Sequence, residues 1–164
     1  MNVDCDFIVG LIFYLPIRDY SVDVVWSSGV IEHYRINEQQ KSINESLRVL
    51  KKAGRLIVIV PNKKAVVYNI SRMLSMKIGK WKFGYEEPLS PREFYCFQPK
   101  PITCYSIGFL HQFRFITLPI IGFLLNDILN LIYKLCPSLK KLDKRVPGYL
   151  LGALWIKNDI CDAT

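Results

Sequence analysis

Residues 15–62 alternate between strand-like and helix-like patterns in the order that builds a parallel β-sheet. Val22–Ser27 is rich in β-branched and aromatic residues, which predicts a strand. Ser27, Ser28 and Gly29 then end the strand with side chains small enough to let a ligand approach the backbone. Leu56–Val60 is apolar at every position, as expected of a strand whose two faces are both buried. Two such strands joined by a helix predict an α/β fold.

The segment between these strands has helical periodicity from Asn37 onward. Ile43, Leu47 and Leu50 recur at spacings that place them on one helix face. Lys51 and Lys52 are expected in the last helical turn, where cations meet the negative end of the helix dipole. Gly54 is expected in the left-handed conformation that terminates the helix.

The rest of the chain continues the alternation of strands and helices. A helix over Ala65–Met76 is expected to be amphipathic, with Val67, Ile70 and Leu74 on one side. Ser90 is expected to cap a short helix that has Pro91 at its first position. Further strands are expected at Ile102–Ile107 and Tyr149–Ile156, and a buried strand or its remnant at Asp6–Tyr14. Further helices are expected at Ala65–Met76, after Ser90, and at Pro119–Leu135.

Composition narrows the class of protein. With 51% hydrophobic and 22% charged residues, the chain is globular rather than disordered. The net charge of +8 is spread over separate lysine groups, so a solvated basic surface is favoured over nucleic-acid binding. The five cysteines are far apart and form no Cys-x-x-Cys pair, so no metal site is expected, and reduced thiols in a cytoplasmic protein are favoured.

The most apolar segment is Phe115–Cys136. Its longest uncharged stretch lies between Arg114 and Asp127, which is shorter than the roughly 20 residues that a membrane-spanning helix needs. The helix expected at Pro119–Leu135 is open to three interpretations: core burial, contact in a homodimer, or adsorption to a membrane surface. The first two are favoured.

The stretch LPIRDYSVDVVWSSGVIEHY resembles the middle of a class I S-adenosylmethionine-dependent methyltransferase, specifically the type 11 methyltransferase domain. Members of that family read LPF-x-D-x-S-F-D-V-V, then S-x-G-V-L-E-H, then R-V-L-K-P-G-G-x-L-x-I-x-x-P. The similarity covers residues 10–62 closely and Trp81–Phe94 more loosely. Matching positions are Leu15, Pro16, Asp19, Ser21, Asp23, Val24, Val25, Ser27, Gly29, Val30, Glu32, His33, Arg48, Val49, Leu50, Lys51, Gly54, Leu56 and Pro61.

The resemblance implies a partial Rossmann-like sheet, mostly parallel with a C-terminal antiparallel strand and flanked by helices. It implies methyl transfer from S-adenosylmethionine to a small-molecule or lipid acceptor. Residues 1–164 are expected to form a single, N-terminally incomplete domain, with 1–62 the remnant of the cofactor half and 63–164 the substrate part. By resemblance, the cofactor-binding residues are Asp19, Ser27, Ser28, Gly29 and Val30, with the last four beside the methionine part of the cofactor.

Three polar anchors of the family pattern are missing from this sequence. Gly10 is the only glycine before Gly29, so no Gly-rich turn precedes the matching stretch, and the acidic residue for the ribose hydroxyls has no counterpart. Leu11 follows Gly10 where the family commonly has Asp near the adenine amine. At about 1–3 kcal/mol for each lost polar contact, cofactor binding by this chain alone is expected to be weakened by orders of magnitude. The alternatives are therefore a non-enzymatic interaction module, or one half of a two-chain or dimeric methyltransferase whose unpaired sheet edge is covered by a second copy or a complementing chain.

Glu32 and His33 form the candidate acid–base pair. At the end of a strand beside a pocket, His33 is able to accept a substrate proton or to orient a substrate. A histidine at a helix start that makes one local hydrogen bond explains the same residue and is the favoured interpretation. Aromatic side chains at Trp81, Phe83 and Tyr85, with Tyr105, are open to a similar choice between a lid over an apolar substrate and packing under a long loop, and packing is favoured.

Overall fold

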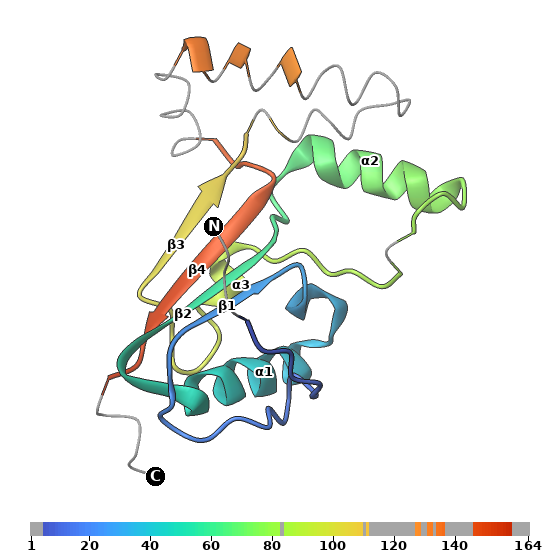
Figure 1. Ribbon diagram of the computed structural model, residues 1–164. Helices are drawn as coiled ribbons and strands as arrows, with labels where there is room; N and C mark the ends of the chain where they lie inside the picture. The colour runs from blue at the N-terminus through green and yellow to red at the C-terminus, as the bar shows by residue number, and fades with distance from the viewer. Residues whose placement is uncertain are drawn as a thin grey trace.

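A computed structural model describes residues 5–82, 84–109, 111, 127–128, 131–132, 134–136 and 146–158. Its centre is a four-stranded sheet in the order β1-β2-β4-β3 (Figure 1). The strands are β1 (Val22–Ser28), β2 (Leu50–Pro61), β3 (Thr103–Ile107) and β4 (Leu150–Ile156).

The first two strands and the helix between them form the expected crossover unit. β1 and β2 are parallel, with Val25 opposite Leu56 and Ser28 opposite Ile59. Helix α1 (Ile36–Val49) begins where the side chain of Glu38 accepts a hydrogen bond from the amide of Arg35 at 3.0 Å. This confirms the strand–helix–strand order predicted from the sequence.

The C-terminal strand gives the sheet its mixed character. β4 is antiparallel to both of its neighbours, β2 and β3, so β1, β2 and β3 all run in one direction. The fold is therefore an α/β sheet that is mostly parallel with one C-terminal antiparallel strand, as expected.

The core lies on one face of the sheet. Alternate residues of β2 and β4, such as Leu56, Val58 and Trp155, share one buried cluster with residues of α1 and of the short helix α3 (Pro91–Phe94). Trp155 on β4 is 1% exposed, and its ring lies against Phe94 with a centroid distance of 5.9 Å. The main apolar cluster comprises Ile31, Ile43, Leu50, Leu56, Val58, Val60, Leu89, Phe94, Phe97, Leu151, Ala153 and Trp155.

Helices α2 and α3 also form where the sequence places them. The Ser90 hydroxyl accepts from the amide of Glu93, and the Glu93 carboxylate accepts from the amide of Ser90 at 2.7 Å, which completes the expected capping box. Helix α2 (Val66–Lys77) leaves the end of β2 and extends away from the sheet (Figure 1). The only buried side chain of α2 is Tyr68. Ile70 and Leu74, which were expected on the apolar side of this amphipathic helix, are 52% and 57% exposed.

The strand expected at Asp6–Tyr14 is wrong. The structure describes all of Asp6–Tyr14. Leu11 and Tyr14 form an isolated bridge with each other, and no strand is present in this segment. Phe7 and Val9 are more than nine-tenths exposed. The apolar pattern did not produce a strand because no neighbouring strand of the described chain pairs with it.

The helix end expected at Lys51–Gly54 is also wrong. Lys51, Lys52 and Gly54 belong to β2, which begins at Leu50, directly after the last residue of α1. Ala53, not Gly54, has the positive φ of 60°. Gly54 is required for a different reason: a Cβ atom there would lie 2.8 Å from the Lys51 carbonyl oxygen and 3.1 Å from that of Asp23.

The helix expected at Pro119–Leu135 lies largely outside the described residues, which include helical positions at 127–128, 131–132 and 134–135. Among the residues that the structure describes, no helix has both the length and the apolar character needed to cross a bilayer.

Candidate functional site

Ser27, Ser28, Gly29 and Val30 lie together at the carboxyl end of β1, next to the carboxyl end of β2. The amide of Gly29 donates to the carbonyl oxygen of Ile59 at 3.0 Å, which ties the turn to the neighbouring parallel strand. Gly29 has a φ of 70°, a left-handed conformation that favours glycine. Ser28 and Gly29 are exposed, so the backbone is open to a ligand where α/β sheets usually bind one.

The Glu32 carboxylate lies directly behind this turn. Glu32 is in the one-turn helix η1 (Ile31–His33) and is only 2% exposed. A Cβ atom on Gly29 would lie 3.8 Å from its Oε1 atom. Its Oε2 atom is buried and has no hydrogen-bond partner among the residues that the structure describes. An unpaired buried carboxylate oxygen is costly, which is typical of an acceptor that a ligand satisfies.

The surroundings of Glu32 shift its pKa upward. Burial raises the pKa of Glu32 above its ordinary value, and the nearby Glu86 adds a smaller effect in the same direction. The backbone amides of Glu32 and Val30 and the adjacent His33 oppose these effects without cancelling them.

His33 is held in one tautomer by its neighbour. Its Nδ1 atom lies 2.6 Å from the carbonyl oxygen of Tyr85. Because a carbonyl oxygen can only accept, Nδ1 carries the hydrogen, and the Nε2 atom of the neutral ring keeps its lone pair. His33 is half-buried, so Nε2 is the atom that can take a proton from a substrate. This hydrogen bond reaches a residue 52 positions away, so it is not the local hydrogen bond expected of a histidine at a helix start.

The Tyr85–Glu87 loop, far along the chain, contacts both Glu32 and His33. The amide of Glu87 donates to the Glu32 carbonyl oxygen at 2.8 Å. The Tyr68 hydroxyl donates to Glu86, and Nη1 of Arg72 donates to the Glu86 carbonyl oxygen at 2.8 Å. Burial and this hydrogen bond raise the pKa of Tyr68, so the hydroxyl keeps its proton.

Tyr68 and Glu86 were not identified from the sequence. The two side chains are 18 residues apart, and no spacing rule links a helix residue to a loop residue across such a gap. The aromatic-acidic composition of the Trp81–Glu87 loop was the only available signal.

Asp19 lies at the opposite end of β1 from the other proposed cofactor residues. Its carboxylate pairs with the guanidinium of Arg48, which also binds Glu45 at 2.8 Å. The hydrogen bond from Arg48 holds the pKa of Glu45 below its usual value. The structure therefore does not bring Asp19 together with Ser27, Ser28, Gly29 and Val30.

The aromatic residues considered as a lid do not all lie in one place. Trp81 packs edge-on against Tyr68 with a centroid distance of 6.4 Å. Tyr105 lies on β3, at the other edge of the sheet from β1, and Phe83 lies outside the described residues. In the part of the chain that the structure describes, no group of three or more His, Cys, Asp or Glu side chains is arranged to hold a metal ion.

Comparison with known proteins assigns the fold. Residues 1–58 match the family model of the methyltransferase domain, and the fold matches solved SAM-dependent methyltransferases. Residues 1–58 are therefore similar to a methyltransferase domain, and the α/β fold is that of solved SAM-dependent methyltransferases. The carboxyl end of β1 lies where open α/β sheets usually bind a ligand.

Individual relatives of the methyltransferase domain are distant in sequence. "Uncharacterized protein MJ0638" of Methanocaldococcus jannaschii is 30% identical over 140 residues, which are 85% of this chain and 56% of that protein. A Thermotoga maritima SAM-dependent methyltransferase, described as a possible histamine N-methyltransferase, has a TM-score of 0.57 at 17% identity. The similarity covers 91% of this chain and 62% of that one. The complex between the Trm112 methyltransferase activator of Haloferax volcanii and a methyltransferase gives a TM-score of 0.58 at 16% identity, over 98% of this chain and 66% of that one.

The chain spans 56% of the length of this curated relative and 66% of that solved chain. The structural similarities support the fold alone.

Proposed function

We propose that this chain supplies the carboxyl half of an S-adenosylmethionine-dependent methyltransferase site. In this proposal, the exposed backbone of Ser28 and Gly29 flanks the methionine part of the cofactor, together with Ser27 and Val30. The observation that carries the proposal is the left-handed turn at Gly29, which is tied to the parallel strand β2. Behind it lies the buried Oε2 atom of Glu32, which no described residue hydrogen-bonds.

The acceptor is proposed to be a small molecule or a lipid that reaches the same end of the sheet. His33 is proposed to orient it and to take its proton through Nε2, since Nδ1 is occupied. Many methyl transfers need only an in-line arrangement of donor and acceptor, so positioning is the larger share of the expected role.

A second polypeptide segment is proposed to complete the site. Among the described residues, β1 pairs with β2 alone, and Val24 and Trp26 on β1 are 51% and 67% exposed. An open edge flanked by exposed apolar side chains is a template for strand pairing. A segment carrying a Gly-rich turn, in this protein or in a second chain, would occupy it. The Trm112 complex is a precedent, among proteins of similar fold, for a methyltransferase with a partner chain.

We also propose a cytoplasmic location. The described cysteines Cys5, Cys96, Cys104 and Cys136 are all unpaired, which is usual in a reducing compartment.

Calorimetric titration with S-adenosylhomocysteine tests the cofactor proposal. Because three anchors are missing from this sequence, the chain alone is expected to bind in roughly the millimolar range, three orders of magnitude (about 4 kcal/mol) weaker than a micromolar site. Gly29→Ala is expected to weaken this binding. Gly79→Ala is the matched control, because Gly79 has a similar φ of 67° and lies at the end of α2, where a Cβ atom meets nothing within 4 Å.

Equal binding by both variants would contradict the role given to the Gly29 turn. Micromolar binding by the isolated chain would contradict the need for a second segment.

A further inference from the structure

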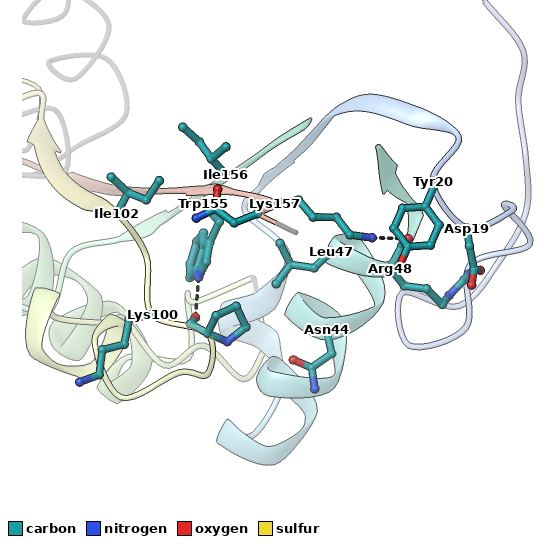
Figure 2. A pocket seen from close by; sticks show the side chains of 12 residues that line it. Asp19, Tyr20, Asn44, Leu47, Arg48, Lys100, Ile102, Trp155, Ile156 and Lys157 are labelled. Carbon is teal, nitrogen blue, oxygen red and sulfur yellow. Dashed lines mark hydrogen bonds and ion pairs between the residues drawn. The ribbon is translucent and has the colours of Figure 1, made fainter. Parts of the chain in front are cut away.

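A cavity of about 420 Å³ opens at the amino end of β1, away from the Gly29 turn. Its walls come from the last turns of α1, the segment before β3 and the end of β4 (Figure 2). This volume lies in the range of about 300–1,000 Å³ that small-molecule sites occupy. The volume of the cavity therefore suits a small molecule as the ligand, and not a protein partner.

The cavity has an apolar floor. Leu47 from α1 and Trp155 from β4 lie in the middle of the lining residues, and Ile102 lies beside them (Figure 2). The Trp155 indole is fixed because its Nε1 donates to the Pro99 carbonyl oxygen at 2.8 Å. Ile102 is 56% exposed, so an apolar group in the cavity would remove it from water at a gain of roughly 25 cal/mol for each Å² covered.

The rim of the cavity is basic. Arg48, Lys100 and Lys157 line it against a single acidic lining residue, Asp19, whose carboxylate is taken up by Arg48. Lys100 is exposed and makes no ion pair or hydrogen bond with any residue that the structure describes. Its ammonium group is therefore available to an anion.

The far side of the rim is rigid. The ammonium of Lys157 lies 3.5 Å from the centroid of the Tyr20 ring and donates to the Arg48 carbonyl oxygen at 3.2 Å. Tyr20 itself has a φ of 53°, an unfavourable conformation that the surrounding contacts maintain. Such a held, strained position is common at ligand sites and reduces the ordering that binding requires.

We propose that this cavity binds a small amphipathic carboxylate, with the apolar part on Leu47, Ile102 and Trp155 and the carboxylate at Lys100. The site lies at the opposite end of β1 from the cofactor candidate, and the proposal does not depend on methyl transfer.

Two probes of equal shape and opposite charge test the proposal, 4-phenylbutyrate and 4-phenylbutylamine, titrated into the whole chain by calorimetry. The carboxylate is expected to bind at least about tenfold more tightly than the amine. Lys100→Glu is expected to abolish this preference, and Ile102→Asp to weaken carboxylate binding by about tenfold or more. Lys64→Glu changes an exposed lysine outside the cavity by the same charge and is expected to bind as the parent does.

Equal affinity for the two probes, an unchanged preference in Lys100→Glu, or no binding of either probe at millimolar concentration would each overturn the proposal. Because Lys100 and Ile102 are exposed, both variants are expected to fold, and thermal melts followed by circular dichroism check this directly.

Discussion

At the scale of single residues, Glu32 is the most informative side chain. Its side chain is 2% exposed, and one of its oxygens has no partner in the described part of the chain, which costs stability. The sequence identified Glu32 and His33 as a candidate pair. The contacts of Glu32 and His33 with the Tyr85–Glu87 loop could not be predicted, because they join residues more than 50 positions apart.

We expect Glu32→Gln to stabilise the chain by about 1 kcal/mol at neutral pH, since a neutral side chain costs less to bury. The raised pKa of Glu32 means that the folded chain keeps a proton that the unfolded chain releases near pH 4.5. The free energy of unfolding of the parent should therefore fall as the pH rises from that value through the folded-state pKa. Urea denaturation at acidic and neutral pH measures this.

The Glu32→Gln variant should lose that part of the pH dependence, whereas Asp6→Asn, at an exposed acidic residue, should retain it. An identical pH dependence in the parent and Glu32→Gln would show that Glu32 is an ordinary solvated carboxylate.

At the scale of elements, the hydrophobic periodicity of the sequence correctly predicted helix α1 and the Leu56–Val60 part of strand β2. The apolar Leu56–Val60 part of β2 is buried or nearly so, and Ile43 on α1 belongs to the same buried cluster. Local patterns failed where long-range pairing decides. Asp6–Tyr14 looks like a strand but has no strand partner in the described chain, and the Lys51–Gly54 segment looks like a helix end but extends β2.

The Ala53–Gly54 pair gives an element-scale prediction. We expect Gly54→Ala to lower the free energy of unfolding by about 1–3 kcal/mol, because the new Cβ atom would press on two carbonyl oxygens of the β1–β2 pair. Ala53→Gly should raise it slightly, by roughly 0.5–1 kcal/mol, because it relieves a φ of 60°. Urea denaturation of both variants tests this, and the opposite order of stabilities would exclude the strand pairing described for this segment.

At the scale of the whole molecule, the sheet is covered unequally. Helices α1 and α3 cover one face in the described part of the chain, while Val24 and Trp26 at the other face and edge are exposed (Figure 1). Natural proteins rarely leave a sheet edge and an apolar face open together. The sequence resemblance suggested this open edge through its missing motifs, and the exposure of Trp26 locates it.

We expect the chain to associate as its concentration rises, through the β1 edge. Trp26→Glu should shift light-scattering masses toward the monomer, because it places a charge on that surface. Ile78→Glu, at a comparably exposed apolar residue beyond α2, should not. A parent chain that stays monomeric at all concentrations would argue against an interface at β1.

The methyltransferase account rests on one end of the sheet, and nuclear magnetic resonance can observe that end even when binding is weak. Titration of the ¹⁵N-labelled chain with S-adenosylhomocysteine should shift the amide signals of Ser28, Gly29 and Val30 in a saturable manner. Signals of Lys100 and Asn158, at the other end of β1, should stay in place. Shifts confined to that other end, or none at millimolar ligand, would contradict a cofactor site at the Gly29 turn.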